Sequence, residues 1–534
     1  MKFSYSNYFL TSEKLLNLSP HLLILLIFFM SLSQLSAQNI LWEENYGGSN
    51  EDRALSMIET SNGNFVVAGS SFSDDGDVGV NQGEKDYWVL KLNQDGAIIW
   101  KKNYGGSDYD IIGSVIETSD GGFAICGASA SDDGDIDENQ GSYDYWILKL
   151  NANGNIEWEQ NYGGSGYEFP NSIIETSDGG LAVAGESKSD DGDVGGNLGF
   201  NDYWIIKLDN NGSLLWEENY GGSNFDIPYT IVEATDGGLI VSGYSNSDDG
   251  DITENKGNDD YWIIKLNANG ILEWQVSYGG SNFDQPTSMI ETSDGGIALT
   301  GFSNSNDGDV GGNEGLYDYW IIKLDANGSL QWEENYGGSD SDSPQSIIET
   351  TDGGLAVVGG SPSDDGDVGG NYGQKDYWVL KLDANGGIEW EKNFGGNDGE
   401  QGNSIIETAD GNLAIAGSSY SDSGDVGGNQ GLIDFWILKI ENQSLGTSRN
   451  IVEDPLSELS LYPNPTSENI TVELTESIDS MTITIHDIRG RKLSQQIIEN
   501  TSLFQLELIG AKGIYLVEFE DTKGNQTVRK VIKD

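Results

Sequence analysis

The chain has 534 residues, with 88 Asp and Glu against 26 Lys and Arg, and a net charge of −62. Residues 38–449 hold 16 basic and 73 acidic residues, so this body carries −57 of that charge. Nucleic acid and anionic membranes are bound through basic faces, and a surface this acidic would repel both. Glycine is frequent, at 73 residues, but follows no triplet repeat. The composition therefore excludes collagen and favours short strands with tight turns.

The N-terminus has the layout of a secretory signal peptide over residues 1–37. Lys2 and Lys14 precede an apolar run from Leu22 to Met30, and small and polar residues follow as far as Ala37. This order predicts export, with cleavage after Ala37. The apolar run is too short to span a bilayer and no later segment is more apolar, so no transmembrane segment is expected in the mature chain.

Residues 38–442 consist of seven copies of a 58-residue unit, marked by two series of tryptophans with that spacing. The first series is Trp42, Trp100, Trp158, Trp216, Trp274, Trp332 and Trp390. The second is Trp88, Trp146, Trp204, Trp262, Trp320, Trp378 and Trp436. A fixed period of this length is typical of propellers and other repeat folds.

One unit predicts four antiparallel strands, over residues 172–176, 181–185, 203–208 and 214–220. Asp178-Gly179-Gly180 and Asn210-Asn211-Gly212 supply hairpin turns, because glycine accepts the positive φ that such turns need. The second strand is apolar on both faces, as an inner strand would be. The fourth alternates apolar and charged residues, which suits an outer edge strand.

The two ends of the array complement each other. It begins with a fourth strand, Ile40–Tyr46, and stops after a third strand, Asp434–Ile440. An N-terminal strand that completes the last unit would close the ring, as in WD-repeat proteins, whereas an open solenoid would need polar capping repeats. The motifs Trp-x-x-x-Tyr-Gly-Gly, Asp-Gly-Gly and Asp-Tyr-Trp resemble the β-propeller repeat of secreted bacterial proteins. We therefore expect an all-β fold with a closed seven-bladed β-propeller.

An acidic loop between the second and third strands is the candidate metal site. Carboxylates, Asn amides and backbone carbonyls are oxygen ligands of the kind that calcium prefers. The alternative is a solvated turn, in which Asp accepts hydrogen bonds from backbone amides. The spacing is not that of an EF-hand, and Asn306 and Ser423 each replace a carboxylate. The calcium candidates are Asp74, Asp77, Asn81, Asp132, Asp135, Asn139, Asp190, Asp193, Asn197, Asp248, Asp251, Asn255, Asp364, Asp367 and Asn371.

Features present in every unit favour structural roles. Asp86 and its six equivalents precede the Tyr-Trp pair, and we expect them to accept hydrogen bonds from amides of the preceding loop. The tryptophans are expected to fill the space between blades. The unpaired Cys126 is expected to be a small buried strand residue.

The segments that lead into each first strand differ between units and should gather around the ring axis. Aromatic residues beside carboxylates there would suit stacking on sugars or binding of a cationic peptide, and loop drift is the alternative. The candidate ligand residues are Tyr109, Tyr167, Phe169, Phe225 and Phe283.

Catalysis has little support in the sequence. The two histidines, His21 and His486, both lie outside residues 38–442, which removes His-based triads and His-ligated zinc from the propeller. Paired carboxylates remain available for hydrolysis, but nothing singles out one pair.

Residues 443–458 form a polar linker, and residues 459–534 predict a small β-sandwich. Tyr462-Pro463-Asn464-Pro465, Asp487-Ile488-Arg489-Gly490, Gly513-Ile514-Tyr515-Leu516-Val517 and Lys530-Val531-Ile532-Lys533 occur in order there. These motifs resemble the type A C-terminal sorting domain of the type IX secretion system. The resemblance implies recognition by that machinery and release or attachment at the cell surface.

The leading hypothesis is a non-enzymatic propeller, secreted or at the cell surface, that binds an extracellular glycan or protein. The alternatives are a structural surface or adhesion component, and a carboxylate-dependent carbohydrate-active enzyme. No cofactor is expected unless the acidic loops bind calcium.

Overall fold

The computed structural model describes residues 39–442, 460–462, 466, 469–487, 492–508, 512–521 and 526–533. The chain divides into two compact units, Met1–Gly446 and Thr447–Asp534. The signal peptide and linker expected from the sequence lie outside the described residues. Within those residues, no helix is long and apolar enough to cross a membrane.

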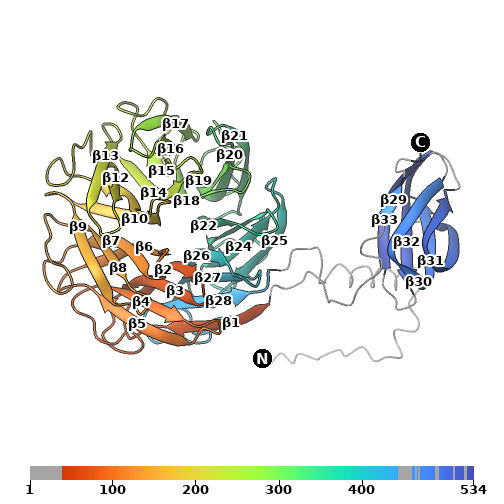
Figure 1. Ribbon diagram of the computed structural model, residues 1–534, viewed down its shortest axis with the longest axis horizontal. Coiled ribbons are helices and arrows are strands. Elements are labelled where there is room, and N and C mark those ends of the chain that lie inside the picture. Colours follow the sequence, from red (N-terminus) through yellow and green to blue (C-terminus); the bar gives the residue numbers. More distant parts are fainter. Residues whose placement is uncertain are drawn as a thin grey trace, which may run out of the picture. The chain divides into compact units, whose positions relative to one another are not determined.

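The first unit is a seven-bladed β-propeller, with one four-stranded antiparallel sheet per blade (Figure 1). Each innermost strand contacts the innermost strands of both neighbouring blades, so the ring is closed. Blades 1 to 3 comprise β2 (Asp52–Glu59), β3 (Phe65–Ser71), β4 (Asp86–Leu92) and β5 (Ile98–Tyr104); β6 (Asp110–Glu117), β7 (Phe123–Ser129), β8 (Asp144–Leu150) and β9 (Ile156–Tyr162); and β10 (Glu168–Glu175), β11 (Leu181–Ser187), β12 (Asp202–Leu208) and β13 (Leu214–Tyr220).

The remaining blades repeat this order of strands. Blades 4 to 6 comprise β14 (Asp226–Glu233), β15 (Leu239–Ser245), β16 (Asp260–Leu266) and β17 (Leu272–Tyr278); β18 (Asp284–Glu291), β19 (Ile297–Ser303), β20 (Asp318–Leu324) and β21 (Leu330–Tyr336); and β22 (Ser343–Glu349), β23 (Leu355–Ser361), β24 (Asp376–Leu382) and β25 (Ile388–Phe394). Blade 7 comprises β26 (Glu400–Glu407), β27 (Leu413–Ser419), β28 (Asp434–Ile440) and the N-terminal β1 (Ile40–Tyr46). The predicted closure by the N-terminal strand is therefore confirmed, since β1 pairs antiparallel with β28.

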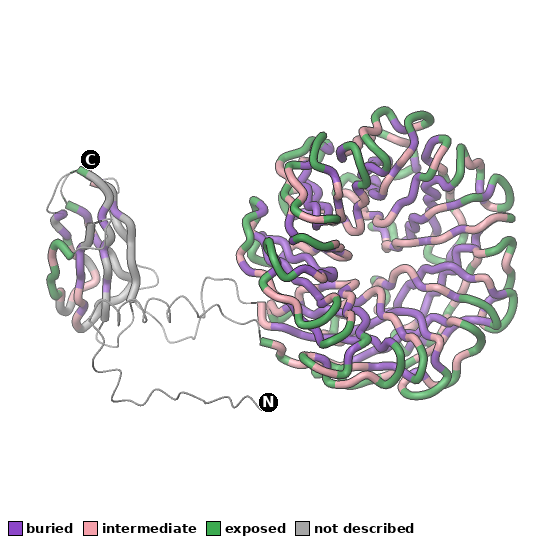
Figure 2. The backbone as a smooth tube through the Cα atoms, turned by 180° about the vertical axis from the view of Figure 1, so that it is seen from behind, coloured by how far each residue is buried: buried purple, intermediate pink, exposed green. Residues whose placement is uncertain are grey.

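Burial follows the position of each strand within its blade. Every residue of the third strands is buried, and so is nearly every residue of the second strands, whereas the fourth strands mix exposed and partly buried residues and most end in a buried aromatic (Figure 2). The third-strand tryptophans are completely buried, and their rings pack on aromatic residues of adjacent blades. Tyr87, for example, lies 4.7 Å from Trp146 between ring centroids, and Tyr145 lies 4.5 Å from Trp204. The third-strand tryptophans therefore fill the space between blades, as the sequence predicts.

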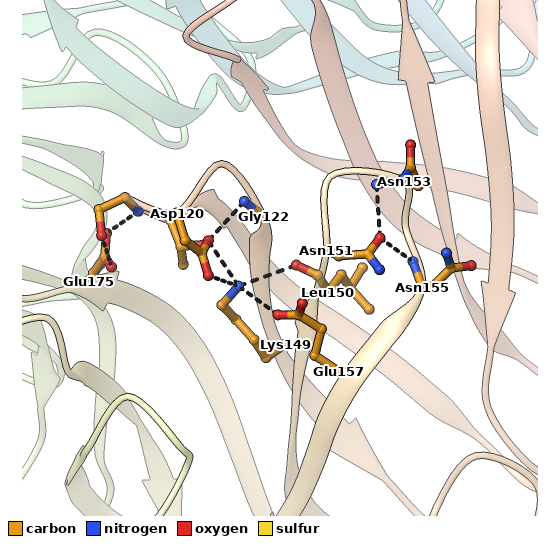
Figure 3. Close-up of polar contacts among 11 residues, drawn as sticks. Asp120, Gly122, Lys149, Leu150, Asn151, Asn153, Asn155, Glu157 and Glu175 are labelled. Atoms are coloured by element: carbon orange, nitrogen blue, oxygen red, sulfur yellow. Dashed lines mark hydrogen bonds and ion pairs between the residues drawn. The ribbon is translucent and has the colours of Figure 1, made fainter.

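One end of the ring, here called face B, carries the hairpin turns. Figure 3 shows Lys149 on this face, where its Nζ forms ion pairs with Asp120 at 2.9 Å and Glu157 at 3.4 Å and donates to the Leu150 carbonyl. Asn151 accepts from the backbone N–H groups of Asn153 and Asn155 in the next hairpin. Equivalent ion pairs recur in five other blades, so face B is held by repeated structural contacts. They join Lys207, Lys265, Lys323, Lys381 and Lys439 to Asp178, Asp236, Asp294, Asp352 and Asp410.

The C-terminal unit is an antiparallel sheet of five strands that packs on itself, in agreement with the predicted small β-sandwich. The order is β29 (Ser460–Tyr462), β30 (Asn469–Asp487), β32 (Gly513–Asp521) and β33 (Gln526–Lys533), and β31 (Lys492–Glu507) also pairs with β30. The pairing of β30 with β31 is interrupted between Glu473 and Ile478. Residues from both sides of this interruption, such as Val472 and Ile483, share one buried core.

Candidate ligand-binding face

The other end of the ring, here called face A, is where the first and third strand of every blade begin. Seven parallel bridges join the residue before each third strand to the residue before the next first strand. They pair Lys85 with Tyr109 and Tyr143 with Tyr167, and the Asp110 backbone N–H donates to the Lys85 carbonyl at 2.6 Å. Since the first strands are innermost (Figure 1), these bridges gather the segments that vary between units near the ring axis.

Four of the five predicted ligand residues take part in aromatic contacts on face A, which form three separate groups across blades 1 to 4. Tyr167 and Phe169 are 5.8 Å apart between ring centroids, and Phe169 also lies 4.9 Å from Tyr143 of the preceding blade. Tyr109 meets Phe72 edge-on at 6.1 Å, and Phe225 stacks on Phe200 at 5.0 Å with 12° between the planes. We call these seven residues the aromatic patch: Phe72, Tyr109, Tyr143, Tyr167, Phe169, Phe200 and Phe225.

Several rings of the aromatic patch remain open to solvent. Tyr109 is 39% exposed, Phe225 40% and Phe200 51%, whereas Tyr167 and Phe169 are half-buried. The fifth predicted residue, Phe283, is 40% exposed but belongs to none of these ring pairs, and its backbone N–H donates to Asn304. The structure therefore brings four of the five candidates together with three aromatic residues that the sequence did not identify.

Those three residues occupy positions that vary between units in the same way as the predicted ones. Phe72 follows the second strand of its blade, Tyr143 directly precedes a third strand, and Phe200 lies two residues before one. The equivalents of Phe72 are Ala130, Lys188, Asn246, Asn304, Pro362 and Tyr420. Comparing the seven copies at these positions could have found them, but only the fold shows that they adjoin the first-strand segments.

Basic residues occur at the same variable positions. The Lys85 ammonium lies 5.4 Å from the centre of the Phe72 ring, and the Lys188 ammonium lies 5.2 Å from that of Tyr167. The Arg53 guanidinium lies over Tyr420 at 5.7 Å and donates to its hydroxyl at 2.9 Å. Aromatic and cationic side chains thus adjoin on face A, in a body that is otherwise strongly acidic.

Pairs of buried carboxyls lie between the blades, deeper than the aromatic patch. The carboxyls of Asp86 and Asp110 flank Gly105, where a Cβ would lie 2.5 Å from Asp86 Oδ1 and 2.6 Å from Asp110 Oδ2. Burial raises the pKa of Asp86 to about 7 and that of Asp110 to about 6, against the opposing effect of hydrogen bonds. The Gln82 backbone N–H donates to Asp86 at 2.6 Å, which is the loop contact expected from the sequence.

The same pairing recurs at all seven junctions, so it is part of the blade architecture. The other pairs are Asp144 with Glu168, Asp202 with Asp226, Asp260 with Asp284, Asp318 with Asp342, Asp376 with Glu400, and Asp434 with Asp52. At every junction the third-strand Asp keeps one buried oxygen, Oδ1, without a hydrogen-bond partner among the described residues.

The predicted calcium ligands point in different directions. In the first unit, Asp74 is exposed, and the Asn81 amide donates to the Ser71 carbonyl at 3.2 Å while its oxygen accepts from the Gly83 N–H. Asp77 instead accepts from Gln430 of blade 7 at 2.7 Å. The other four units are alike: Asp132, Asp190, Asp248 and Asp364 are exposed, and Asn139, Asn197, Asn255 and Asn371 donate to the end of the second strand.

The middle residue of each of these four predicted sets lies against a neighbouring blade, as Asp77 does. Asp135 and Asp193 accept from Gln82 and Gln140, and Asp251 and Asp367 accept from the N–H groups of Gly221 and Gly337. In the part of the chain that the structure describes, no group of three His, Cys, Asp or Glu is arranged to hold a metal ion. This geometry favours the turn interpretation, and calcium binding stays a prediction.

Comparison with known proteins assigns the C-terminal unit. Residues 460–534 match the family of secretion system C-terminal sorting domains, which is the sorting domain expected from the sequence. The protein is therefore an exported β-propeller, directed by the type IX system to the cell surface or the extracellular space.

The similarities of the remaining chain are distant. The regulatory protein FlaEY of Caulobacter vibrioides is 25% identical over 180 residues, which cover 30% of this chain and 18% of that protein. A fungal alcohol oxidase in complex with copper shares 13% identity with a TM-score of 0.45, covering 93% of this chain and 100% of its own. A puromycin hydrolase mutant shares 9% identity with a TM-score of 0.42, covering 83% of this chain and 58% of its own. None of these similarities indicates what this chain binds or whether it is catalytic.

Proposed function

We propose that this protein is a non-enzymatic binding protein of the cell surface or extracellular space, and that it binds saccharides through the aromatic patch. The observation that carries the proposal is the occurrence of partly exposed aromatic ring pairs on face A in blades 1 to 5, whereas among the described residues no such ring pair occurs on face A in blades 6 and 7. The positions equivalent to Tyr109 are Ser341 in blade 6 and Gly399 in blade 7. A structural role shared by all blades would need these rings in every copy.

Sugar rings present C–H faces that pack on aromatic rings, and neighbouring hydroxyls then find polar partners at the rim. Face A offers such partners beside the rings. The Tyr167 hydroxyl donates to Asn201 at 3.2 Å, and Asp108 precedes Tyr109 at an exposed position. A non-catalytic role is supported by the buried carboxyls, which recur at every junction instead of forming one distinct pair.

The test is binding of the full chain to a panel of immobilised oligosaccharides, followed by titration calorimetry with those that bind. We expect the double variant Tyr109→Ala, Phe225→Ala to weaken binding at least tenfold, because it removes two exposed rings from opposite ends of the patch. Tyr372→Ala is the matched control, since Tyr372 is an exposed aromatic, 58% accessible, on an acidic loop outside the patch.

Equal affinity of the double variant and the control would contradict the proposal. So would turnover of any bound oligosaccharide, detected as new reducing ends, because the role proposed is non-catalytic.

A further inference from the structure

Basic residues are scarce in the propeller, and their distribution is uneven. Of those between residues 39 and 442, seven are the third-strand lysines Lys91, Lys149, Lys207, Lys265, Lys323, Lys381 and Lys439. The eight that do not repeat are Arg53, Lys85, Lys101, Lys102, Lys188, Lys256, Lys375 and Lys392. Four of these eight occupy variable positions. Arg53 lies at the start of a first strand, Lys85 and Lys375 directly precede third strands, and Lys188 directly follows a second strand. Half of the non-repeated cations thus occupy the variable positions of face A.

Arg53 and Lys85 lie close enough to repel each other. The pKa of Lys85 is lowered, chiefly by burial and further by the charge of Arg53, against the opposing effect of Glu51. Arg53 has a loose contact with Glu51, 3.4 Å from Nη2 to Oε2, and both side chains are more than a third exposed. Among the described residues, Lys85 forms no ion pair. Because few carboxylates neutralise these two neighbouring positive charges, an added anion would bind there favourably.

Lys375 adds a third cation, on the other side of blade 7. Its Nζ donates to Ser343 Oγ at 2.8 Å, and its aliphatic chain lies over Gly360, the position that Tyr244 and Phe302 occupy in blades 4 and 5. Burial lowers the pKa of this lysine, and within the described residues no carboxylate is near enough for an ion pair. Lys375 is thus a partly buried cation in a chain of net charge −62, and its hydrogen bond to Ser343 leaves its charge without a carboxylate partner in the described part of the chain.

We propose that the saccharide bound by face A is anionic, with carboxylate or sulfate groups that pair with Lys85, Arg53 and Lys375. This inference rests on the proposed function, because it adds the charge of the ligand to the stacking of its rings. Lys85 connects the two parts of the site. Its ammonium contacts Phe72, and Phe72 contacts Tyr109, so a sugar ring on these two aromatics would bring an acidic substituent to Lys85 and Arg53.

The experiment compares hexasaccharides of matched length in titration calorimetry with the full chain. The probes are oligogalacturonate, a sulfated galactan fragment and a neutral galactan fragment, with poly-glutamate as an acidic peptide. The acidic body repels anions at low ionic strength, so the titrations are run near physiological salt, where the Debye length is about 8 Å. We expect at least one anionic hexasaccharide to bind tenfold or more tightly than the neutral one, about 1.4 kcal/mol.

The variants separate charge from stacking. The double variant Lys85→Gln, Lys375→Gln should weaken binding of the anionic saccharide at least tenfold more than binding of the neutral one. Lys101→Gln is the control, since Lys101 is an exposed lysine of the outer strand β5 and should change nothing. Comparison of the carboxylated and sulfated probes decides which acidic group is preferred.

The possible failures are distinguishable. Neutral and anionic saccharides of equal affinity, or anionic binding that the lysine variants do not change, would overturn the inference and leave the saccharide function standing. Binding of poly-glutamate with no saccharide binding at all would overturn both.

Discussion

Gly395 shows how little space remains at the junction between two blades. It lies between the buried carboxyls of Asp376 and Glu400, and an added Cβ would overlap both. We predict that Gly395→Ala destabilises the propeller by about 1–3 kcal/mol, the usual cost of overpacking a closed interior. Thermal unfolding of the full chain, followed by calorimetry, measures this change.

Gly399 provides the matched control in the same connection between blades. A Cβ there would meet only the ring of Tyr420, at 3.8 Å, and the backbone does not have positive φ. Gly399→Ala should therefore leave the melting temperature almost unchanged. If the two variants melted alike, the close fit of the carboxyl pair would not be what limits this position.

The carboxyl pairs also show where prediction from sequence ends at the scale of residues. The role of Asp86 in accepting from its own loop could be predicted, because Gln82 is only four residues away. The approach of Asp86 to Asp110 could not, because it depends on how closely adjacent blades pack. For the same reason, the aromatic patch was predicted only in part.

At the scale of elements, β1 completes blade 7 and also contacts blade 1. Glu43 of β1 accepts from the Trp436 indole at 3.0 Å and from the Gly427 backbone at 3.2 Å. Tyr46 donates to the carbonyl of Gly96 in the next blade. We predict that deleting residues 39–46 lowers the melting temperature and exposes the apolar face of β28, measured as binding of a hydrophobic dye.

A rearranged chain tests whether stability depends on the position of this strand in the sequence or only on its presence in blade 7. Moving residues 39–46 to follow Ile440, joined by the turn sequence of residues 93–97, makes the last hairpin of blade 7 continuous, as in the other blades. This variant should recover most of the lost stability. A deletion variant that melts like the parent would show that ring closure does not depend on β1.

The strands themselves could largely be predicted, because hairpin signals fix their ends. The fourth strand of the third blade was predicted at residues 214–220, where β13 lies. Its first strand was predicted from Ser172 but begins at Glu168. The difference has a local cause: the pairing of β10 with β11 shifts between Pro170 and Ser172, and a proline before a bulge does not resemble a strand in sequence.

At the scale of the whole molecule, the seven buried third-strand aspartates make stability depend on pH. Burial raises the pKa of Asp86, Asp202, Asp260 and Asp376 to about 7, and that of Asp144, Asp318 and Asp434 to about 6. In the unfolded chain an Asp has a pKa of about 3.9. Between about pH 4 and pH 7 the folded protein therefore binds more protons than the unfolded chain, and its stability falls as the pH rises.

We predict a higher melting temperature near pH 5 than near pH 8, with most of the change between about pH 5 and pH 7. Below about pH 4 the trend should reverse. Asp120, Asp178 and Asp294, whose pKa is lowered to about 2 chiefly by hydrogen bonds from Thr118, Thr176 and Thr292, then lose stabilising contacts as they are protonated. Calorimetry of the full chain across this range gives the complete profile.

Repulsion across the acidic surface acts in the same direction, because the net charge of −62 at pH 7 diminishes as the pH approaches the isoelectric point of about 4.1. Salt separates the two causes. At about 0.5 M salt the screening length is below about 5 Å, which suppresses repulsion between exposed charges but acts much less on buried ones. The fall in melting temperature from about pH 5 to pH 7 should therefore persist in high salt if buried carboxyls cause it. If this fall disappeared in high salt, repulsion between surface charges would be its cause. Ionisation of the buried carboxyl pairs would then cost the folded protein little stability.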